Sequence, residues 1–258
     1  MALSFINDDS EEYFNNQKVF YKYMKLSDAL KSLKKDKKKE EPYLWFANPI
    51  EWKDPYEKRF INAKYDNKSI EFLFKEKILC YCLAEPKENE AQWKAYNENE
   101  LAVRFTIYRE KLYEILDVSS NKLDVFSNKN DYNIYIGKVK YISAKTIKTN
   151  DLSKIFDFSL NFNEEKGILN LLLLKRNDFK YEAETRVIIV KDNADKKGEK
   201  LFYDTIEPKE LIKEITLDPN IDDNLCEILK QHFKTKYDIN AEKSKLYKDL
   251  KHPVTIKM

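Results

Sequence analysis

The stretch ILCYCLAEPKENEAQWKAYNENELAVRF, residues 78–105, decides the fold because two strand-like segments flank a helix-like one. Its two ends, 78–83 and 101–107, are short and rich in β-branched and aromatic side chains, a composition that predicts strands. The middle, 88–97, predicts a helix. The unit therefore predicts a sheet that carries a helix against one face.

Strands and helices alternate irregularly along the rest of the chain. Further strands are predicted at residues 19–24, 43–47, 134–142, 184–190, 212–217 and 254–257. Further helices are predicted at residues 27–35, 69–77, 107–116, 163–176 and 221–233. Several of these strands are joined by stretches too short for the crossover that a parallel pair needs. The pattern predicts an α+β fold: a single domain over residues 1–258, with a mixed, mostly antiparallel sheet flanked by helices.

The composition excludes several familiar site types. Hydrophobic residues make up 42% of the 258 residues and aromatic residues 14%, enough for a packed core. Only three glycines are present, so the chain holds no glycine-rich phosphate loop or dinucleotide fingerprint. Only two histidines are present, which excludes a three-histidine metal site. Acid and base chemistry must therefore come mainly from Asp, Glu, Tyr, Lys or Cys.

Charge and cysteine usage indicate a cellular setting. The 47 basic and 45 acidic side chains leave a formal charge of +2, which is no global polycation for nucleic acid. The three cysteines form no disulfide framework, and the N-terminus has no basic leader followed by a long apolar stretch. The longest apolar cluster, 168–174, is far below the ~20 residues of a membrane span. We expect a cytoplasmic protein with no membrane partner.

The lysine-rich run KSLKKDKKK, residues 31–39, is the one strongly biased stretch. Such a run is typical of a helix end and an exposed loop. A contact with polyphosphate or nucleic acid is the alternative interpretation.

The segment KYEAETRVIIV, residues 180–190, carries the best candidate site. Residues two apart on a strand share a face, so Glu182, Glu184 and Arg186 are expected to project together. Arg is rare in this chain, and its planar fork suits a carboxylate or phosphate. The alternative is an exposed strand edge with a cross-strand salt bridge.

A second segment, LWFANPIEWKDPYEKRF, residues 44–60, places Asn48, Asp54 and Glu57 on turns marked by two prolines. Turns of this kind often carry functional side chains. A local role for Asp54, as the cap of a short helix that opens at Pro55, is the alternative.

Within the opening stretch, Cys80 and Cys82 share a strand face but lack the further thiols or imidazoles of a zinc site, so we interpret them as core cysteines. Trp93 and Tyr96 share a helix face, which usually means packing against the sheet. Whether they line the core or a site is left open.

Taken in order, these stretches resemble the uncharacterised bacterial domain-of-unknown-function family DUF2971, over residues 19–217, with 218–258 as a C-terminal helix and strand. The residues that carry the resemblance are Tyr21-Lys22-Tyr23, the aromatic strand Leu44 to Phe46, Lys53-Asp54-Pro55-Tyr56-Glu57, Cys80 to Cys82 with Trp93 and Tyr96, and Lys175 with Tyr181-Glu182-Ala183-Glu184-Thr185-Arg186. Two departures are Lys53, where the family usually has Asn, and Glu100-Leu101, where it usually has Gly.

A second, weaker resemblance is to ADP-ribosyltransferase toxins, in which a late Glu orients the nicotinamide ribose of NAD and stabilises an oxocarbenium-like transition state. It implies Glu184 as the catalytic Glu, Tyr21, Lys22 and Tyr23 as the first-strand element, and Phe46 to Asn48 as the second. It also implies NAD as substrate, a protein or nucleic-acid acceptor, and a toxin-like or anti-phage defence role.

Two other classes remain open. A metal-dependent nuclease would use Asp54, Glu57, Glu182 and Glu184 to hold a divalent ion. A non-catalytic module would bind a nucleotide or a partner protein through Arg186, Lys175 and the acidic residues. We therefore predict catalytic roles for Glu182, Glu184 and Arg186, and ligand-binding roles for a wider set: Tyr21, Lys22, Tyr23, Asn48, Asp54, Glu57, Trp93, Tyr96 and Lys175.

Overall fold

The fold is described from a computed structural model of the chain. It describes residues 3–34, 41–62, 64–65, 68–69, 77–97, 100–121, 132–148, 165–191, 194–195, 197–203 and 206–248.

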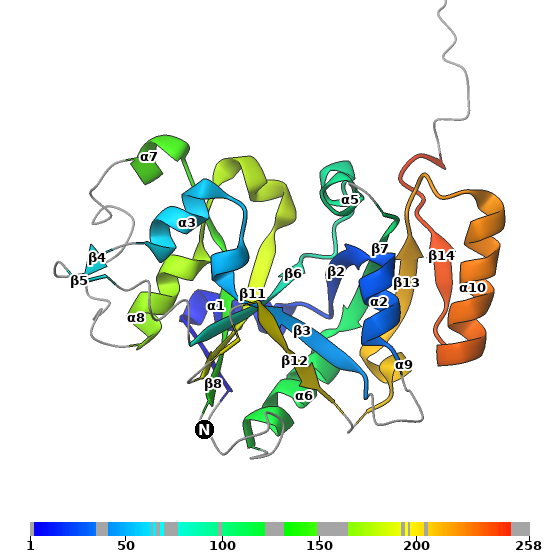
Figure 1. Ribbon diagram of the computed structural model, residues 1–258, viewed down its shortest axis with the longest axis horizontal. Helices are drawn as coiled ribbons and strands as arrows, with labels where there is room; N and C mark the ends of the chain where they lie inside the picture. Colours follow the sequence, from blue (N-terminus) through cyan, green and yellow to red (C-terminus); the bar gives the residue numbers. More distant parts are fainter. Residues whose placement is uncertain are drawn as a thin grey trace, which may run out of the picture.

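One large mixed sheet runs through the middle of the molecule (Figure 1). Its strands follow the order β1 (Leu3–Phe5), β8 (Tyr132–Lys138), β11 (Glu184–Lys191), β6 (Ile78–Ala84), β2 (Val19–Lys25), β7 (Ala102–Tyr108), β13 (Ile212–Leu217) and β14 (Ala241–Lys243). The β1–β8 and β13–β14 pairs are parallel and the other neighbours are antiparallel. The predicted α+β class with a mixed, mostly antiparallel sheet is confirmed.

The sheet forks at one edge of β6. Strand β2 joins this edge at Tyr21 opposite Ala84, and strand β3 (Tyr43–Ala47) joins it at Ala47 opposite Cys80. Strand β12 (Gly198–Phe202) pairs with β3 and extends this branch. Each of the two strands pairs with β6 at a single position, so the stretch of β6 between Cys80 and Ala84 has no ladder partner recorded on this edge among the described residues.

Alternate residues of the central strands supply two large cores, beside a smaller cluster of Tyr23, Ala84, Trp93 and Ala102. On β11, Val187 and Ile189 pack into the larger core, which also takes side chains from helices α1 (Asp8–Asn16), α2 (Leu26–Ser32), α6 (Arg109–Asn121) and α10 (Asp223–Tyr237). Ile188 points to the opposite face and packs against α3 (Pro55–Ile61), α8 (Glu165–Leu169) and the 3-10 helix η3 (Asn170–Leu173). The period of two along β11 therefore decides which residues face α3 and η3.

The remaining elements lie around this framework. They are α5 (Glu90–Tyr96), α7 (Ala144–Lys148), α9 (Pro208–Leu211), the 3-10 helices η1 (Pro49–Glu51) and η4 (Asn177–Glu182), and the short strands β4 (Lys64–Tyr65), β5 (Lys68–Ser69), β9 (Lys140–Ile142) and β10 (Leu174–Arg176). None of the helices in the described part of the chain combines the length and the apolar character needed to cross a bilayer.

The helix predicted over residues 163–176 is wrong in its second half. Helix α8 ends at Leu169, η3 follows, and Leu174–Arg176 form β10, which pairs in parallel with β9. The run of leucines is apolar on all sides, so periodicity alone could not separate a buried helix from a buried strand. This difference matters because it places Lys175 on a strand.

The strand predicted over residues 134–142 is also interrupted. Strand β8 ends at Lys138, and the chain turns at Val139, whose amide donates to the Glu184 carbonyl at 2.9 Å. Strand β9 then leaves the large sheet to pair with β10.

Some predicted elements fall on residues outside the described set. These are most of the predicted helix 69–77, the predicted strand 254–257 and part of the lysine run 31–39. Ser69, where the first of these was expected to begin, lies in strand β5. Among the elements that were not predicted are helices α1, α7 and α9 and strands β1, β4, β5, β10, β12 and β14.

Candidate functional site

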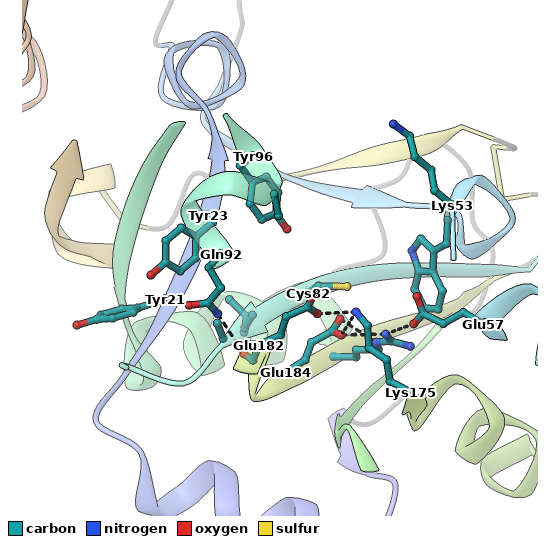
Figure 2. Close-up of a pocket in the computed structure, with 15 residues that line it drawn as sticks. Tyr21, Tyr23, Lys53, Glu57, Cys82, Gln92, Tyr96, Lys175, Glu182 and Glu184 are labelled. Atoms are coloured by element: carbon teal, nitrogen blue, oxygen red, sulfur yellow. Dashed lines mark hydrogen bonds and ion pairs between the residues drawn. The ribbon is translucent and has the colours of Figure 1, made fainter. Parts of the chain in front are cut away.

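A pocket of about 410 Å³ lies where the N-terminal end of β11 meets α3, β10 and α5 (Figure 2). Its walls combine a cluster of charged side chains with several tyrosine rings. This combination brings together five separate stretches of the sequence: 21–23, 52–57, 82–84, 92–96 and 175–186.

The charged cluster is built on one face of β11. Glu184 and Arg186 share that face, as the strand period predicts, and form a two-pronged ion pair: Nε to Oε1 and Nη2 to Oε2, both at 2.9 Å. Arg186 is only 1% exposed. It also donates to the Leu172 carbonyl of η3 and to Glu57 Oε1 of α3, the latter at 2.5 Å. A buried guanidinium with this many acceptors is held rigidly in place.

Glu182 belongs to the cluster, as predicted, but it does not lie on the strand that was expected to carry it. It ends the 3-10 helix η4, and Ala183 follows with a left-handed backbone at φ 42°. This turn reverses the local direction of the chain, so the strand period does not apply to Glu182. Its carboxylate nevertheless meets the cluster, because Lys175 Nζ lies 2.5 Å from Glu182 Oε2 and 3.1 Å from Glu184 Oε2.

The two carboxyl groups that share this ammonium differ in acidity. Burial and the neighbouring Glu184 raise the pKa of Glu182 to about 7, against the opposing effect of Lys175. Burial also penalises the ionised form of Glu184, but Arg186 and Lys175 outweigh it and hold the pKa of Glu184 well below its usual value. Burial by itself would lower the pKa of Lys175, but the carboxylates around it, Glu184 above all, outweigh burial and raise the pKa above its usual value, so Lys175 stays an ammonium.

A count of charges explains the shift at Glu182. Three carboxylates, Glu57, Glu182 and Glu184, surround two cations, Lys175 and Arg186. Fully ionised, the cluster carries one net negative charge in a partly buried setting. A proton on Glu182, whose side chain is 23% exposed, removes that excess at the smallest cost.

Helix α3 supplies Glu57, and Asp54 is the cap that positions this helix. The Asp54 carboxylate accepts from the Tyr56 amide at 3.0 Å, and Pro55 occupies the first turn. Asp54 also pairs with Arg176 at 3.4 Å, outside the pocket lining. Asn48 is buried and caps η1 through the Ile50 amide at 3.0 Å, again away from the lining.

Tyrosine rings form the wall opposite the charged cluster. Tyr23 stacks on Tyr96 with centroids 6.2 Å apart and meets Tyr21 edge to face at 6.4 Å. Figure 2 shows Tyr21 and Tyr23 beside Gln92, with Tyr96 above them and the carboxylates of the cluster to the right of Tyr21. Trp93 is 2% exposed, packs edge to face on Tyr23 and belongs to the core, so the Trp93–Tyr96 helix face divides between core and pocket.

Lys22, between the two tyrosines of β2, points to the other face of the strand and lines a second cavity. Of the residues predicted from the sequence, the pocket therefore gathers Glu57, Glu182, Glu184, Arg186, Lys175, Tyr21, Tyr23 and Tyr96. It does not gather Lys22, Asn48, Asp54 or Trp93.

Sequence reasoning missed several lining residues, and three of them, Trp52, Gln92 and Cys82, contact or lie beside the charged cluster. Trp52 lies under the Arg186 guanidinium, 4.1 Å from its ring centre, and Gln92 donates to the Glu182 carbonyl at 3.2 Å. Gln92 stands four residues before Tyr96, a spacing that placed both on one helix face and was a usable signal. Cys82 also lines the pocket, whereas it was expected in the core; burial, with Glu184 nearby, raises the pKa of its thiol to about 12.

The carboxylates of the cluster are poor candidates for metal ligands. Their oxygens already accept hydrogen bonds from Lys175 and Arg186, whose charges oppose a divalent cation. Within the described ranges, no group of three His, Cys, Asp or Glu side chains is arranged to hold a metal ion.

Comparison with known proteins gives one match. No curated protein and no solved structure matches the chain. The model of DUF2971, a family of proteins of unknown function, matches residues 92–187, which include Gln92, Tyr96, Lys175 and the Glu182–Arg186 segment. The resemblance expected from the sequence motifs is confirmed over this part of the chain: residues 92–187 are similar to DUF2971.

Proposed function

We propose that the pocket binds NAD and cleaves its nicotinamide–ribose bond, as an ADP-ribosyltransferase-like enzyme. The observation that carries this proposal is the pair of carboxyl groups, Glu182 and Glu184, held on one ammonium at the floor of a pocket walled by tyrosines. Paired carboxyl groups whose pKa values are pushed apart are typical of an acid–base pair.

The charge of the pocket suits the nicotinamide ring of NAD, which is a pyridinium cation. Tyr96, which is 38% exposed, offers a ring face for a cation–π contact, whereas Tyr21 already carries the Arg104 guanidinium 3.8 Å from its ring centre and Tyr23 is stacked on Tyr96. The cluster beneath these rings has an excess of one carboxylate. A pyridinium bound here would replace the proton on Glu182. Affinity for the cation should therefore rise as the pH passes through about 7, the pKa of Glu182.

The proposed step divides the work between the two carboxyl groups. The bond between ribose C1′ and the nicotinamide nitrogen breaks, and its electron pair leaves with the nitrogen, which becomes neutral. Ionised Glu184 stabilises the positive charge that develops on the ribose, and Lys175 and Arg186 position it. Glu182 accepts the proton of the acceptor, a water or a hydroxyl of a protein or nucleic acid, as its oxygen bonds to C1′.

This proposal is favoured over a metal-dependent nuclease because the positive charges of Lys175 and Arg186, bonded to these carboxylates, oppose a divalent cation more strongly than the single charge that develops on a ribose. Turnover of NAD would suit a toxin-like or anti-phage effector, since loss of NAD or modification of an essential component stops growth.

The experiment has a binding arm and a turnover arm. Binding of 1-methylnicotinamide is compared with that of nicotinamide, which has the same ring without the charge. We expect the cation to bind more tightly, with a preference that grows from pH 6 to pH 8 and is lost in Glu182→Gln. Release of nicotinamide from NAD should fall by about 100-fold or more in Glu182→Gln and Glu184→Gln.

Glu110→Gln, which removes an exposed carboxylate far from the pocket lining, is the matched control and should behave as the parent protein. Equal affinity for the charged and neutral rings, together with no nicotinamide release, would overturn the proposal. Cation preference without release would leave a binding module in its place.

A further inference from the structure

The second cavity, of about 600 Å³, adjoins the fork in the sheet. Most of its lining is apolar or aromatic, including Tyr81, Phe105 and Tyr203. Its volume lies within the range of roughly 300–1,000 Å³ that is usual for small-molecule sites. The proposed reaction does not use this space.

Lys22 is the charged group of this cavity that lies deepest in the sheet. Between the joints of β2 and β3, the Cys82 carbonyl of β6 faces the fork and accepts from Lys22 Nζ at 2.8 Å. The ammonium also lies 4.5 Å from the centre of the Tyr81 ring. Of its three donors, one is used by this carbonyl.

Lys22 has no carboxylate partner in the part of the chain that the structure describes, where its recorded contacts are a carbonyl and a ring. Burial lowers the pKa of Lys22, and the charges of Cys82 and Glu184, which act on it without a recorded ion pair, only partly oppose that shift. The buried cations of the neighbouring pocket, by contrast, are each matched by carboxylates. An anion that entered the second cavity would supply the missing partner.

We propose that the second cavity is a separate binding site for an aromatic organic anion, whose charged group binds Lys22 and whose ring lies among the apolar walls. Lys25 adds positive charge to the lining, and Lys31 is paired there with Asp28 at 3.4 Å, the one carboxylate among the described residues of the lining. The site is independent of NAD chemistry, although the two cavities share Tyr23, Trp52, Cys82 and Tyr96 as a common wall.

The test uses a matched pair of fluorescent probes. The anion is 1-anilinonaphthalene-8-sulfonate, and the neutral partner is N-phenyl-1-naphthylamine, which has the same rings without the sulfonate. We expect saturable binding of the anion to the folded protein at one site. Lys22→Met should weaken it about tenfold or more, while binding of the neutral probe changes less than about twofold.

Three variants make the result specific. Lys22→Arg keeps the charge and should retain most of the anion affinity, and Lys25→Met removes a rim charge and should have a small effect. Glu182→Gln, which should abolish NAD turnover, should leave anion binding unchanged, so failure of one proposal is distinguishable from failure of the other. Unchanged anion affinity in Lys22→Met, or an equal loss for both probes, would overturn the inference.

Discussion

Glu182 and Glu184 are two residues apart, yet their carboxyl groups are shifted in opposite directions. Glu184 has both oxygens bonded to Arg186 and one also to Lys175, so its ionised form is stabilised. Glu182, by contrast, bonds to the Lys175 ammonium that it shares with Glu184, and the negative charge of Glu184 disfavours its ionised form. The difference arises from position in the cluster, because the two side chains are chemically identical.

This difference predicts a pH dependence of stability. The pKa of Glu182 is raised by folding to about 7, so the folded state binds this proton more tightly than the unfolded chain does. The resulting stabilisation is complete below the unfolded pKa of ~4.3 and is lost as the pH rises through about 7. Glu182→Gln should therefore flatten the decline in unfolding free energy between pH 5 and pH 8, measured by urea denaturation.

The control for this measurement is Glu110→Gln, because Glu110 is exposed and its side chain lies outside the cluster. It should reproduce the slope of the parent protein. A Glu182→Gln variant with the parent slope would show that Glu182 is ionised throughout this range.

At the scale of elements, Gly137 allows η3 to approach the sheet. It lies opposite Arg186 in the β8–β11 pair, and a Cβ placed on it would lie 2.5 Å from Leu173 Cδ1 and 2.9 Å from Ile6 Cδ1. Leu172, the neighbour of Leu173 on η3, provides the carbonyl that accepts from Arg186. The missing side chain thus permits a contact that helps to hold the charged cluster.

Gly137→Ala should lower the free energy of unfolding by about 1–3 kcal/mol, because overpacking forces η3 away from β8. Denaturant unfolding of the single variants and of the double variant with Leu173→Ala tests this assignment. If the added Cβ clashes with Leu173, the double variant should lose less unfolding free energy than the sum of the losses in the two single variants. Additive losses would place the strain elsewhere.

At the scale of the whole molecule, the larger core connects distant parts of the chain. It extends from Phe14 on α1 to Ala241 on β14, and the central sheet passes through it. The sequence predicts a single domain, and we therefore expect one cooperative unfolding transition, because unfolding any part of this core would expose the rest of it to water.

Far-UV circular dichroism and tryptophan fluorescence should therefore give coincident unfolding curves. Trp45 on β3, Trp52 near the pocket and Trp93 on α5 report on different regions of the molecule. Two separated transitions would show that the C-terminal β13–α10–β14 segment, or another part, unfolds by itself.

The sequence by itself determined the features that depend on local period and local chemistry. Strand alternation placed Glu184 and Arg186 on one face, and Asp54 before Pro55 predicted the cap of α3. Strand β3 was predicted at its observed bounds, because its apolar and aromatic residues are bounded by prolines.

Only the tertiary structure decided which of these local units meet. Glu57 contacts Arg186 across 129 positions of the chain, and Lys175 reaches Glu184 because residues 174–176 form a strand where a helix was expected. Glu182 enters the cluster through the left-handed turn at Ala183, which no strand period anticipates. Such contacts depend on strand order, register and the fork of the sheet, and these are set by burial of the whole core, whereas local period sets only which residues share a face.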